Sequence, residues 1–135
     1  MDELEKLRTD PTSWESVAFA APRTDERGTF DSNERARLQV LLALQYDRRE
    51  SDLELIRYLF TSEINAAENE YFQGSGQALT LAAFLLTRFR ELSDTPLFAR
   101  AKLANFDTVC GFPLEFMLFA GGDQTGSYLQ ANNPE

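Results

Sequence analysis

Histidine is absent from this chain of 135 residues. Histidine is the general base of Ser-His-Asp and Cys-His catalytic sites, so both kinds of catalytic site are excluded. Zinc sites that use imidazole ligands are excluded for the same reason. Carboxylates are the catalytic groups that remain. We therefore expect a non-enzymatic protein with no metal and no other cofactor. One enzymatic alternative stays open, a carboxylate-only, Mg²⁺-dependent hydrolase of a phosphorylated small molecule.

Cysteine is nearly as scarce, because Cys110 is the only one in the chain. It cannot form an internal disulfide, which is typical of proteins from a reducing compartment. As a free thiol it is either a nucleophile or redox sensor at the start of a helix opened by Pro113, or a small buried apolar residue. We favour the second interpretation, since free cysteines are among the most buried residue types.

Long apolar runs are missing as well. No stretch approaches the roughly 20 residues that cross a bilayer. The N-terminus, MDELEKLRTD, is charged and lacks the apolar core of a signal peptide. Together with the lone cysteine, these features predict a cytoplasmic protein that does not enter the membrane.

Basic residues are few: eleven Arg and two Lys stand against 22 Asp and Glu, which gives a net charge of −9. Binding to nucleic acid or to an anionic membrane requires a basic surface, so the charge argues against both as partners. We expect the partner to be another protein, and a basic one. Self-association into a homo-oligomeric structural module is a further alternative.

Seven Gly and five Pro leave few turns, which favours helices over a many-stranded sandwich. Periodicity predicts a single all-α domain, residues 1–135, of about six helices in stacked antiparallel pairs. Capping-box spacings at Thr12 and Ser51 mark two helix starts. Residues 22–33 are predicted to be an exposed loop and residues 131–135 a frayed tail. The predicted helices cover Thr12–Ala20, Ser32–Tyr46, a stripe from Ile56 to Tyr71, Gly76–Leu92, Leu97–Phe106 and Leu114–Ala120.

An internal repeat aligns two parts of the chain at an offset of 42 residues, which superimposes Arg48 on Arg90 and Ser51 on Ser93. Each unit is an apolar helix, a charged turn that begins with Ser-Asp, and a more amphipathic helix. This pattern resembles HEAT and armadillo repeats, whose period is roughly 40 to 47 residues. The resemblance implies a short α-solenoid in which flanking helices cap two units. An irregular helical bundle is the alternative.

An acidic surface is the main functional prediction. No Lys or Arg occurs between residues 58 and 87, whereas several glutamates crowd the end of one predicted helix. Negative charge there opposes the helix dipole at a cost of about 0.3–1 kcal/mol per charge. The chain is similar in general character to small bacterial inhibitor and immunity proteins that occlude a basic partner. We therefore predict a partner-binding rim formed by Glu63, Glu68, Glu70 and Tyr71.

Two questions stay open at this point. Basic side chains from a later segment offer an alternative, in which they neutralise the glutamates; the candidates are Arg88, Arg90, Arg100 and Lys102. Aromatic residues near the C-terminus either line a groove for a partner helix or belong to the core, and we favour the core. These aromatic residues are Phe106, Phe112, Phe116 and Phe119.

Overall fold

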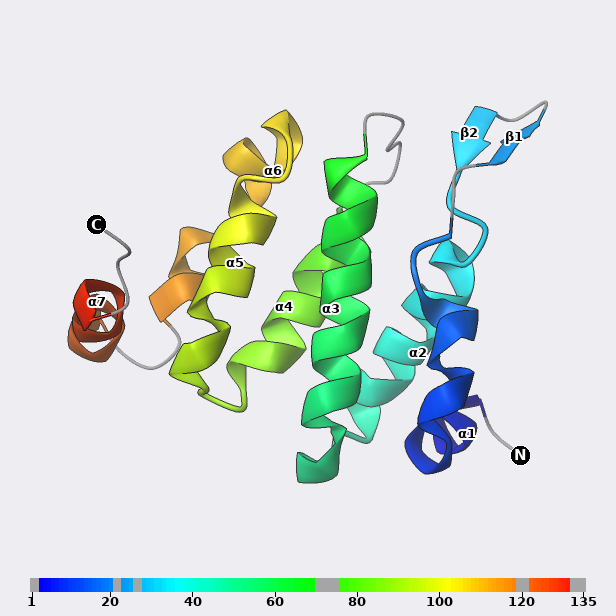
Figure 1. Ribbon diagram of the computed structural model, residues 1–135, viewed down its shortest axis with the longest axis horizontal. Helices are drawn as coiled ribbons and strands as arrows, with labels where there is room; N and C mark the ends of the chain where they lie inside the picture. Colours follow the sequence, from blue (N-terminus) through cyan, green and yellow to red (C-terminus); the bar gives the residue numbers. More distant parts are fainter. Residues whose placement is uncertain (1–2, 21–22, 26–27, 70–75, 119–121, 132–135) are drawn as a thin grey trace.

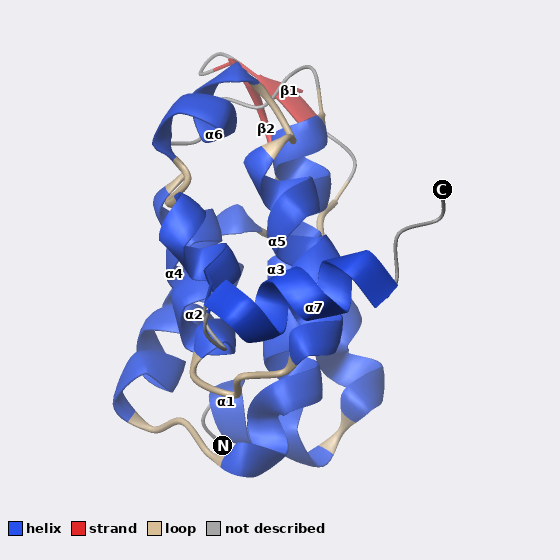
Figure 2. Cartoon of the chain, turned by 90° about the vertical axis from the view of Figure 1, so that its left-hand side faces the viewer, coloured by secondary structure: helices blue, strands red, loops and turns tan. Residues whose placement is uncertain are grey.

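The computed structural model describes residues 3–20, 23–25, 28–69, 76–118 and 122–131. Its helices lie in two layers, with α3 and α5 in one layer and α2 and α4 in the other (Figures 1 and 2). The predicted all-α fold is confirmed, with one short hairpin added. The elements are α1 (Glu3–Thr9), η1 (Pro11–Val17), β1 (Arg23–Asp25), β2 (Gly28–Phe30), α2 (Glu34–Tyr46), η2 (Glu50–Asp52), α3 (Leu53–Glu68), α4 (Gln77–Thr87), η3 (Leu92–Asp94), α5 (Thr95–Lys102), α6 (Phe106–Gly111), η4 (Leu114–Leu118) and α7 (Gly122–Ala131), where η denotes a 3₁₀ helix.

The core lies where α2, α3 and α4 meet. The sequence of α4, QALTLAAFLLT, contains no charged residue, and this helix packs against both α2 and α3. The face of α2 that bears Val40, Leu41 and Leu44 is buried, whereas Leu42 is 44% exposed. α2 is therefore an amphipathic helix with one solvent-facing side.

The N-terminal segment differs from the prediction in two ways. Residues 3–9 form the helix α1, which was not predicted, and its Leu4 and Leu7 are buried in the core. The predicted helix Thr12–Ala20 is instead the shorter 3₁₀ helix η1, capped by the Asp10 carboxylate, which accepts from the Thr12 amide at 3.1 Å. Trp14 fixes η1 to α1 because its indole N–H donates to the Leu7 carbonyl at 2.8 Å.

Residues 22–33, predicted to be an exposed loop, contain an antiparallel hairpin in which Arg23 pairs with Phe30; residues 22, 26 and 27 lie outside the described part. The Asp31 carboxylate holds one end of the hairpin by accepting from the amides of Ala20 and Asn33, both at 3.0 Å. At the other terminus of the chain, α7 continues through residue 131, and the rest of the predicted tail, 132–135, is not described.

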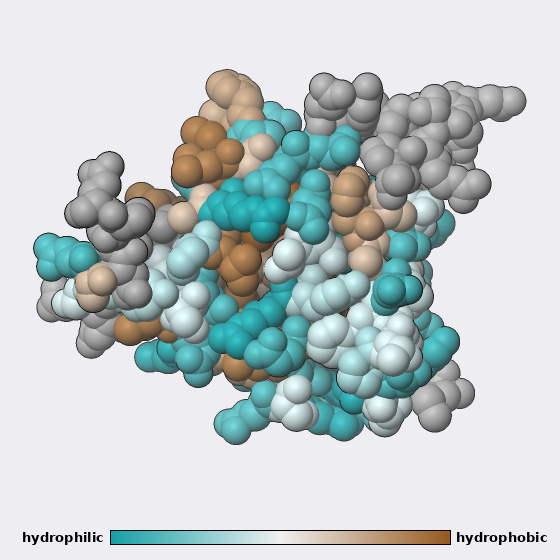
Figure 3. Space-filling view, viewed as in Figure 1, coloured by the Kyte–Doolittle hydropathy of each residue, from teal (hydrophilic) through white to brown (hydrophobic). Residues whose placement is uncertain are grey.

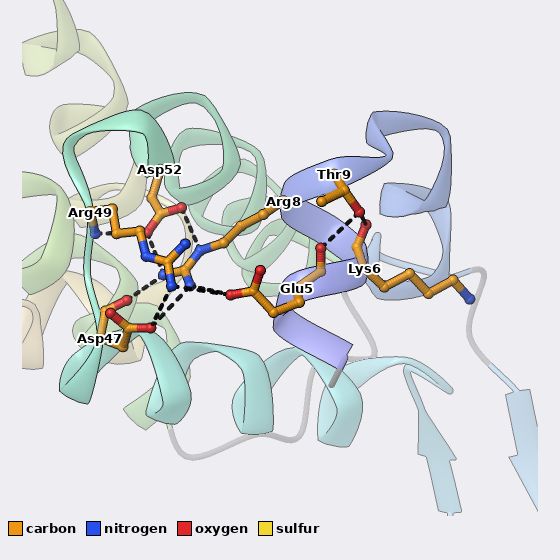
Figure 4. Close-up of polar contacts among 7 residues, drawn as sticks. All are labelled: Glu5, Lys6, Arg8, Thr9, Asp47, Arg49 and Asp52. Atoms are coloured by element: carbon orange, nitrogen blue, oxygen red, sulfur yellow. Dashed lines mark hydrogen bonds and ion pairs between the residues drawn. The ribbon is translucent and has the colours of Figure 1, made fainter. Parts of the chain in front are cut away.

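Two turns in the middle of the chain share their helix starts and a buried aspartate at the 42-residue offset. The helices η2 and η3 begin at residues 50 and 92, and α3 and α5 begin at 53 and 95. Each turn contains a buried aspartate that binds an arginine from another helix. Arg8 donates to Asp52 at 2.8 and 2.9 Å (Figure 4), and Arg57 donates to Asp94 at 2.8 and 3.2 Å. These pairs tie each turn to a helix other than the two that it joins.

The capping prediction at the first of these turns is wrong. Asp52, and not Ser51, supplies the capping carboxylate, which accepts from the Arg49 amide at 2.8 Å. Ser51 is exposed. Aspartate is the stronger cap here because it satisfies the turn amide and the Arg8 guanidinium with one buried group.

Candidate functional site

Glu63, the first residue of the predicted acidic rim, is buried and only 4% exposed. Its carboxylate accepts from Nε of Arg37, which is itself fully buried. Arg37 also donates to the Val17 carbonyl at 3.1 Å and to the Asp31 carboxylate at 2.6 Å. The expectation that Glu63 lies on an exposed surface is therefore wrong, because this side chain compensates a buried cation inside the fold.

The electrostatics of this buried cluster follow from two carboxylates sharing one guanidinium. Burial raises the pKa of Glu63, and the attraction of Arg37 offsets this only in part, while Glu34 and Asp31 add repulsion. Burial acts to lower the pKa of Arg37, but Glu63 and Asp31 outweigh it, so the pKa of Arg37 is raised. The arginine is therefore charged, and burial makes Glu63 easier to protonate than an exposed glutamate.

Glu68, the second predicted residue, lies at the last position of α3 and is partly exposed. Arg100 of α5 donates to both of its carboxylate oxygens, at 2.5 and 3.0 Å, and to the Asn65 side chain at 2.7 Å. This ion pair lowers the pKa of Glu68. The sequence left open whether a later basic residue neutralises the glutamates. At Glu68 this is the case, because Arg100 neutralises it.

Glu70 and Tyr71, the remaining predicted residues, lie outside the described part of the chain. The helix predicted to run through Tyr71 ends at Glu68, since Asn69 has an extended backbone. Of the four predicted residues, the structure describes Glu63 and Glu68. These two do not form an open surface, since Glu63 is buried and Glu68 is paired with Arg100.

Large apolar side chains are exposed at the C-terminal end instead. Of the eight such side chains in the described residues, six lie between residues 84 and 118. They come from four places: α4, α6, η4 and the turn that follows α5. η4 contacts both α4 and α5, and α6 contacts α5. We call this set the C-terminal apolar surface: Phe84, Leu103, Phe106, Val109, Leu114 and Leu118.

The short helix α6 shows how this surface arises. Asn105 caps the helix by accepting from the Thr108 amide at 2.9 Å, and the Thr108 hydroxyl donates to the Lys102 carbonyl at 3.1 Å. These bonds turn Thr108 inward, so Phe106 and Val109, on the opposite face, point to solvent with 79% and 45% exposure. Figure 3 shows apolar side chains gathered over α6. An exposed patch of this kind marks an interaction site more often than an isolated apolar side chain does.

The predicted aromatic residues divide between core and surface. Phe112 is buried and stacks on Phe60 with ring centres 6.5 Å apart, and Phe116 packs against it edge-on. Phe106 is exposed, whereas Phe119 lies outside the described residues. The core interpretation therefore applies to Phe112 and Phe116, and it is wrong for Phe106.

Cys110 also differs from the prediction, because it is exposed and not buried. It lies near the end of α6 and not at the start of a helix opened by Pro113. As residue i+4 from Phe106, it belongs to the outward face of α6.

Among the described residues, no group of three or more His, Cys, Asp or Glu side chains is placed so that it could hold a metal ion. Glu91 and Asp94 form the one ExxD pair in the sequence, the spacing by which carboxylates of a helical bundle can hold Mg²⁺, and here the aspartate is buried and bound by Arg57. Nor does any described helix have both the length and the apolar character to cross a bilayer.

Comparison of the chain with protein-family models, with curated proteins and with solved structures found no match. We therefore base the functional proposal on the geometry and chemistry of the C-terminal apolar surface. No Lys or Arg follows Lys102 in the sequence, so the segment that carries Phe106 is free of basic residues.

Proposed function

We propose that this protein is a non-enzymatic binding module that occludes or scaffolds a basic protein partner through its C-terminal apolar surface. The single observation that carries the proposal is the solvent exposure of Phe106 and of its apolar neighbours between residues 103 and 118, a segment that contains no Lys or Arg. We also propose that the protein acts in the cytoplasm, where its single cysteine stays reduced.

Exposed apolar area supplies the driving force for such binding. Covering a side chain the size of phenylalanine contributes about 1.5–3 kcal/mol. Aromatic residues near the centre of an interface often carry most of its affinity. Phe106 is 79% exposed and Leu103 is 72% exposed, so both have most of their surface still to bury.

Charge supports a basic partner over an acidic or neutral one. The 33 residues from 103 to 135 contain four acidic residues and no Lys or Arg. On α6 itself, Asp107 is exposed beside Phe106. Complementary charge at the rim of an apolar patch accelerates association and selects the partner. Such a surface repels other acidic proteins, including copies of this chain with their own charge of −9.

Self-association is the second candidate, because the same exposed apolar residues favour it. An acidic homodimer would place Asp107 near further negative charge, so we expect it to form only as salt rises and screens the repulsion. A heterologous complex with a basic protein has the opposite dependence and weakens as salt rises. The direction of the salt effect therefore separates the two functions.

The test is affinity capture from a lysate of the native host at low and at moderate salt, with light scattering of the isolated protein under the same conditions. The proposal expects one basic protein to be retained at low salt and released as salt rises, while the isolated chain stays monomeric. An empty capture with a salt-promoted dimer would replace it by the homo-oligomeric module.

A further inference from the structure

Three arginines gather where α2 and α4 end. Arg48 follows the last residue of α2 by two positions. Arg88 and Arg90 follow α4 and flank Phe89. The guanidinium of Arg48 lies 5.0 Å from the centre of the Phe89 ring, so the two helix ends lie side by side. α2 and α4 also contact each other within the layer that they form (Figure 2). The three arginines therefore belong to one region of the surface.

None of these arginines is neutralised within the part of the chain that the structure describes. No carboxylate there forms an ion pair with Arg48, Arg88 or Arg90. The sequence made Arg88 and Arg90 candidates to neutralise the glutamates of α3, but Arg100 takes that role at Glu68. Arg88 and Arg90 are exposed, so their charges are accessible to the anionic groups of a partner.

The carboxylates that neighbour these arginines in the sequence leave an excess of positive charge. They are Asp47, Glu50 and Glu91. Asp47 is already paired, because it accepts from Arg8 and Arg49. Burial and the nearby charge of Glu91 raise the pKa of Asp94, so Glu91 lies close to η3. Once Asp47 and Arg49 are set against each other, three arginines stand against two carboxylates, on a chain whose net charge is −9.

Arg90 is also the one described residue other than glycine that has a left-handed backbone, with φ of 55°. It follows α4 at a position where a helix commonly ends in glycine, which adopts this conformation without strain. The turn does not require an arginine, since the bond made here runs from the Arg90 amide to the Thr87 carbonyl at 3.2 Å. A strained residue whose charged side chain is exposed and has no ion pair points to a role for that side chain.

Exposed apolar side chains adjoin the arginines. At the 42-residue offset, Leu42 of α2 corresponds to Phe84 of α4, and these side chains are 44% and 41% exposed. Tyr46, one turn after Leu42, is 88% exposed. The guanidinium of Arg88 lies 5.9 Å from the centre of the Phe84 ring. An arginine held against a ring keeps its edge free for a fork of hydrogen bonds to a carboxylate. We call this set the arginine surface: Leu42, Tyr46, Arg48, Phe84, Arg88 and Arg90.

We propose that the arginine surface binds an acidic segment of a second protein partner, with Asp or Glu side chains on the arginines and apolar side chains on Leu42 and Tyr46. Charge complementarity selects this occupant. A nucleic acid fits less well, because the net charge of −9 repels a polyanion at long range. The surface lies outside residues 103–118, on which the proposed function rests. The inference therefore goes beyond that function and gives the protein two partners of opposite charge, which can be tested independently.

The probe is a synthetic 15-residue peptide of Glu and Leu at helical spacing with a fluorescent label, and fluorescence anisotropy measures its affinity for the full-length protein. The net charge of −9 repels this peptide from most of the molecule, so binding requires a local basic site. We expect binding at low salt that weakens about tenfold as the salt concentration rises to about 0.2 M. In amide NMR spectra, the shifts on binding should concentrate at residues 42–48 and 84–90.

Variants then locate the site. Arg88→Gln and Arg90→Gly should each weaken binding of the Glu peptide about threefold, and the double variant about tenfold. Arg90→Gly also removes the backbone strain, so its melting temperature should stay the same or rise. Arg35→Gln is the control with the same loss of charge. Arg35 is an exposed arginine of α2, about 16 Å along the helix from Tyr46, so its variant should bind the peptide like wild type.

Absence of binding, an equal loss of affinity for Arg35→Gln, or shifts confined to other helices would each overturn the arginine surface. A lower melting temperature for Arg90→Gly would assign that side chain to the fold and not to a partner. Tighter binding of a single-stranded oligonucleotide of the same charge would replace the acidic protein segment by nucleic acid. A wild-type dimer that Arg88→Gln dissociates would make a second copy of the chain the occupant.

Discussion

Replacing Glu63 with alanine would remove one of the two carboxylates that compensate the buried guanidinium of Arg37. The remaining contacts of Arg37 would be the Asp31 carboxylate at 2.6 Å and the Val17 carbonyl at 3.1 Å. Arg37 is fully buried, so water cannot replace the lost partner without opening the contact between α2 and α3. The cluster would change from net negative to neutral, but one guanidinium nitrogen would lose its acceptor.

Breaking a buried ion pair on one side typically costs about 3–5 kcal/mol. Because Asp31 still neutralises the charge, we expect the lower end, about 3 kcal/mol, out of a total stability of about 5–15 kcal/mol for a domain of this kind. The double variant Arg37→Met with Glu63→Leu fills the same space with apolar groups. It should lose less than the sum of the losses of Arg37→Met and Glu63→Leu measured singly, with a coupling energy of at least 1 kcal/mol.

Urea unfolding followed by far-UV circular dichroism gives these free energies, with Trp14 fluorescence as a second probe of the same transition. Glu54→Ala is the matched control, since Glu54 lies on the same helix with a 70% exposed side chain. Its loss should stay below about 1 kcal/mol. A loss of less than 1 kcal/mol for Glu63→Ala, or strictly additive losses in the double variant, would refute the role assigned to the buried pair.

Three further predictions concern other parts of the fold. Asp52→Asn and Asp94→Asn each weaken an equivalent arginine contact, and each should lower the unfolding free energy by about 2 kcal/mol in urea titrations; a loss at only one turn would show that the turns are not equivalent. Since burial raises the pKa of Glu63, the native state binds its proton more tightly than the unfolded chain does. Wild-type protein should therefore gain stability relative to Glu63→Gln as the pH falls from 7 toward about 4.3, and a relative loss would contradict this sign. Exposed Cys110 should react with Ellman's reagent in native protein at nearly the rate found in urea, whereas strong protection would mean that it is buried.

The central helices were predictable from the sequence because their apolar period is long. The 42-residue offset also located both turns, since each turn contains an aspartate after a serine. The helix α1 was missed for the opposite reason. It offers only Leu4 and Leu7 as apolar residues, and its docking depends on the long-range contact of Arg8 with Asp52. Such tertiary contacts override local pattern.

The burial of Glu63 could have been predicted from its position in the sequence. Glu63 follows Leu59 by four residues and Phe60 by three, so it falls on the apolar face of its helix. Arg37 precedes Val40 and Leu41 by the same spacings on the neighbouring helix. Opposite charges on two apolar faces predict a buried pair better than an acidic surface.

The exposure of Phe106 left no comparable signal. Aromatic residues at helical spacing usually belong to the core. Here the cap formed by Asn105 and Thr108 fixes which face of the short helix α6 turns inward, and that choice is made by hydrogen bonds and not by hydrophobicity. The pattern of apolar residues in the sequence therefore does not show which face of α6 is buried.

The most direct test of the proposed function is capture from native lysate with three forms of the protein: wild type, Phe106→Asp and Tyr46→Asp. Tyr46 is 88% exposed on α2, outside the C-terminal apolar surface, so its variant carries the same added charge at a matched exposed aromatic site. We predict that wild type and Tyr46→Asp retain the same basic protein and that Phe106→Asp does not. Retention of that protein by all three forms, or its loss from both variants alike, would contradict the assignment of binding to the C-terminal apolar surface.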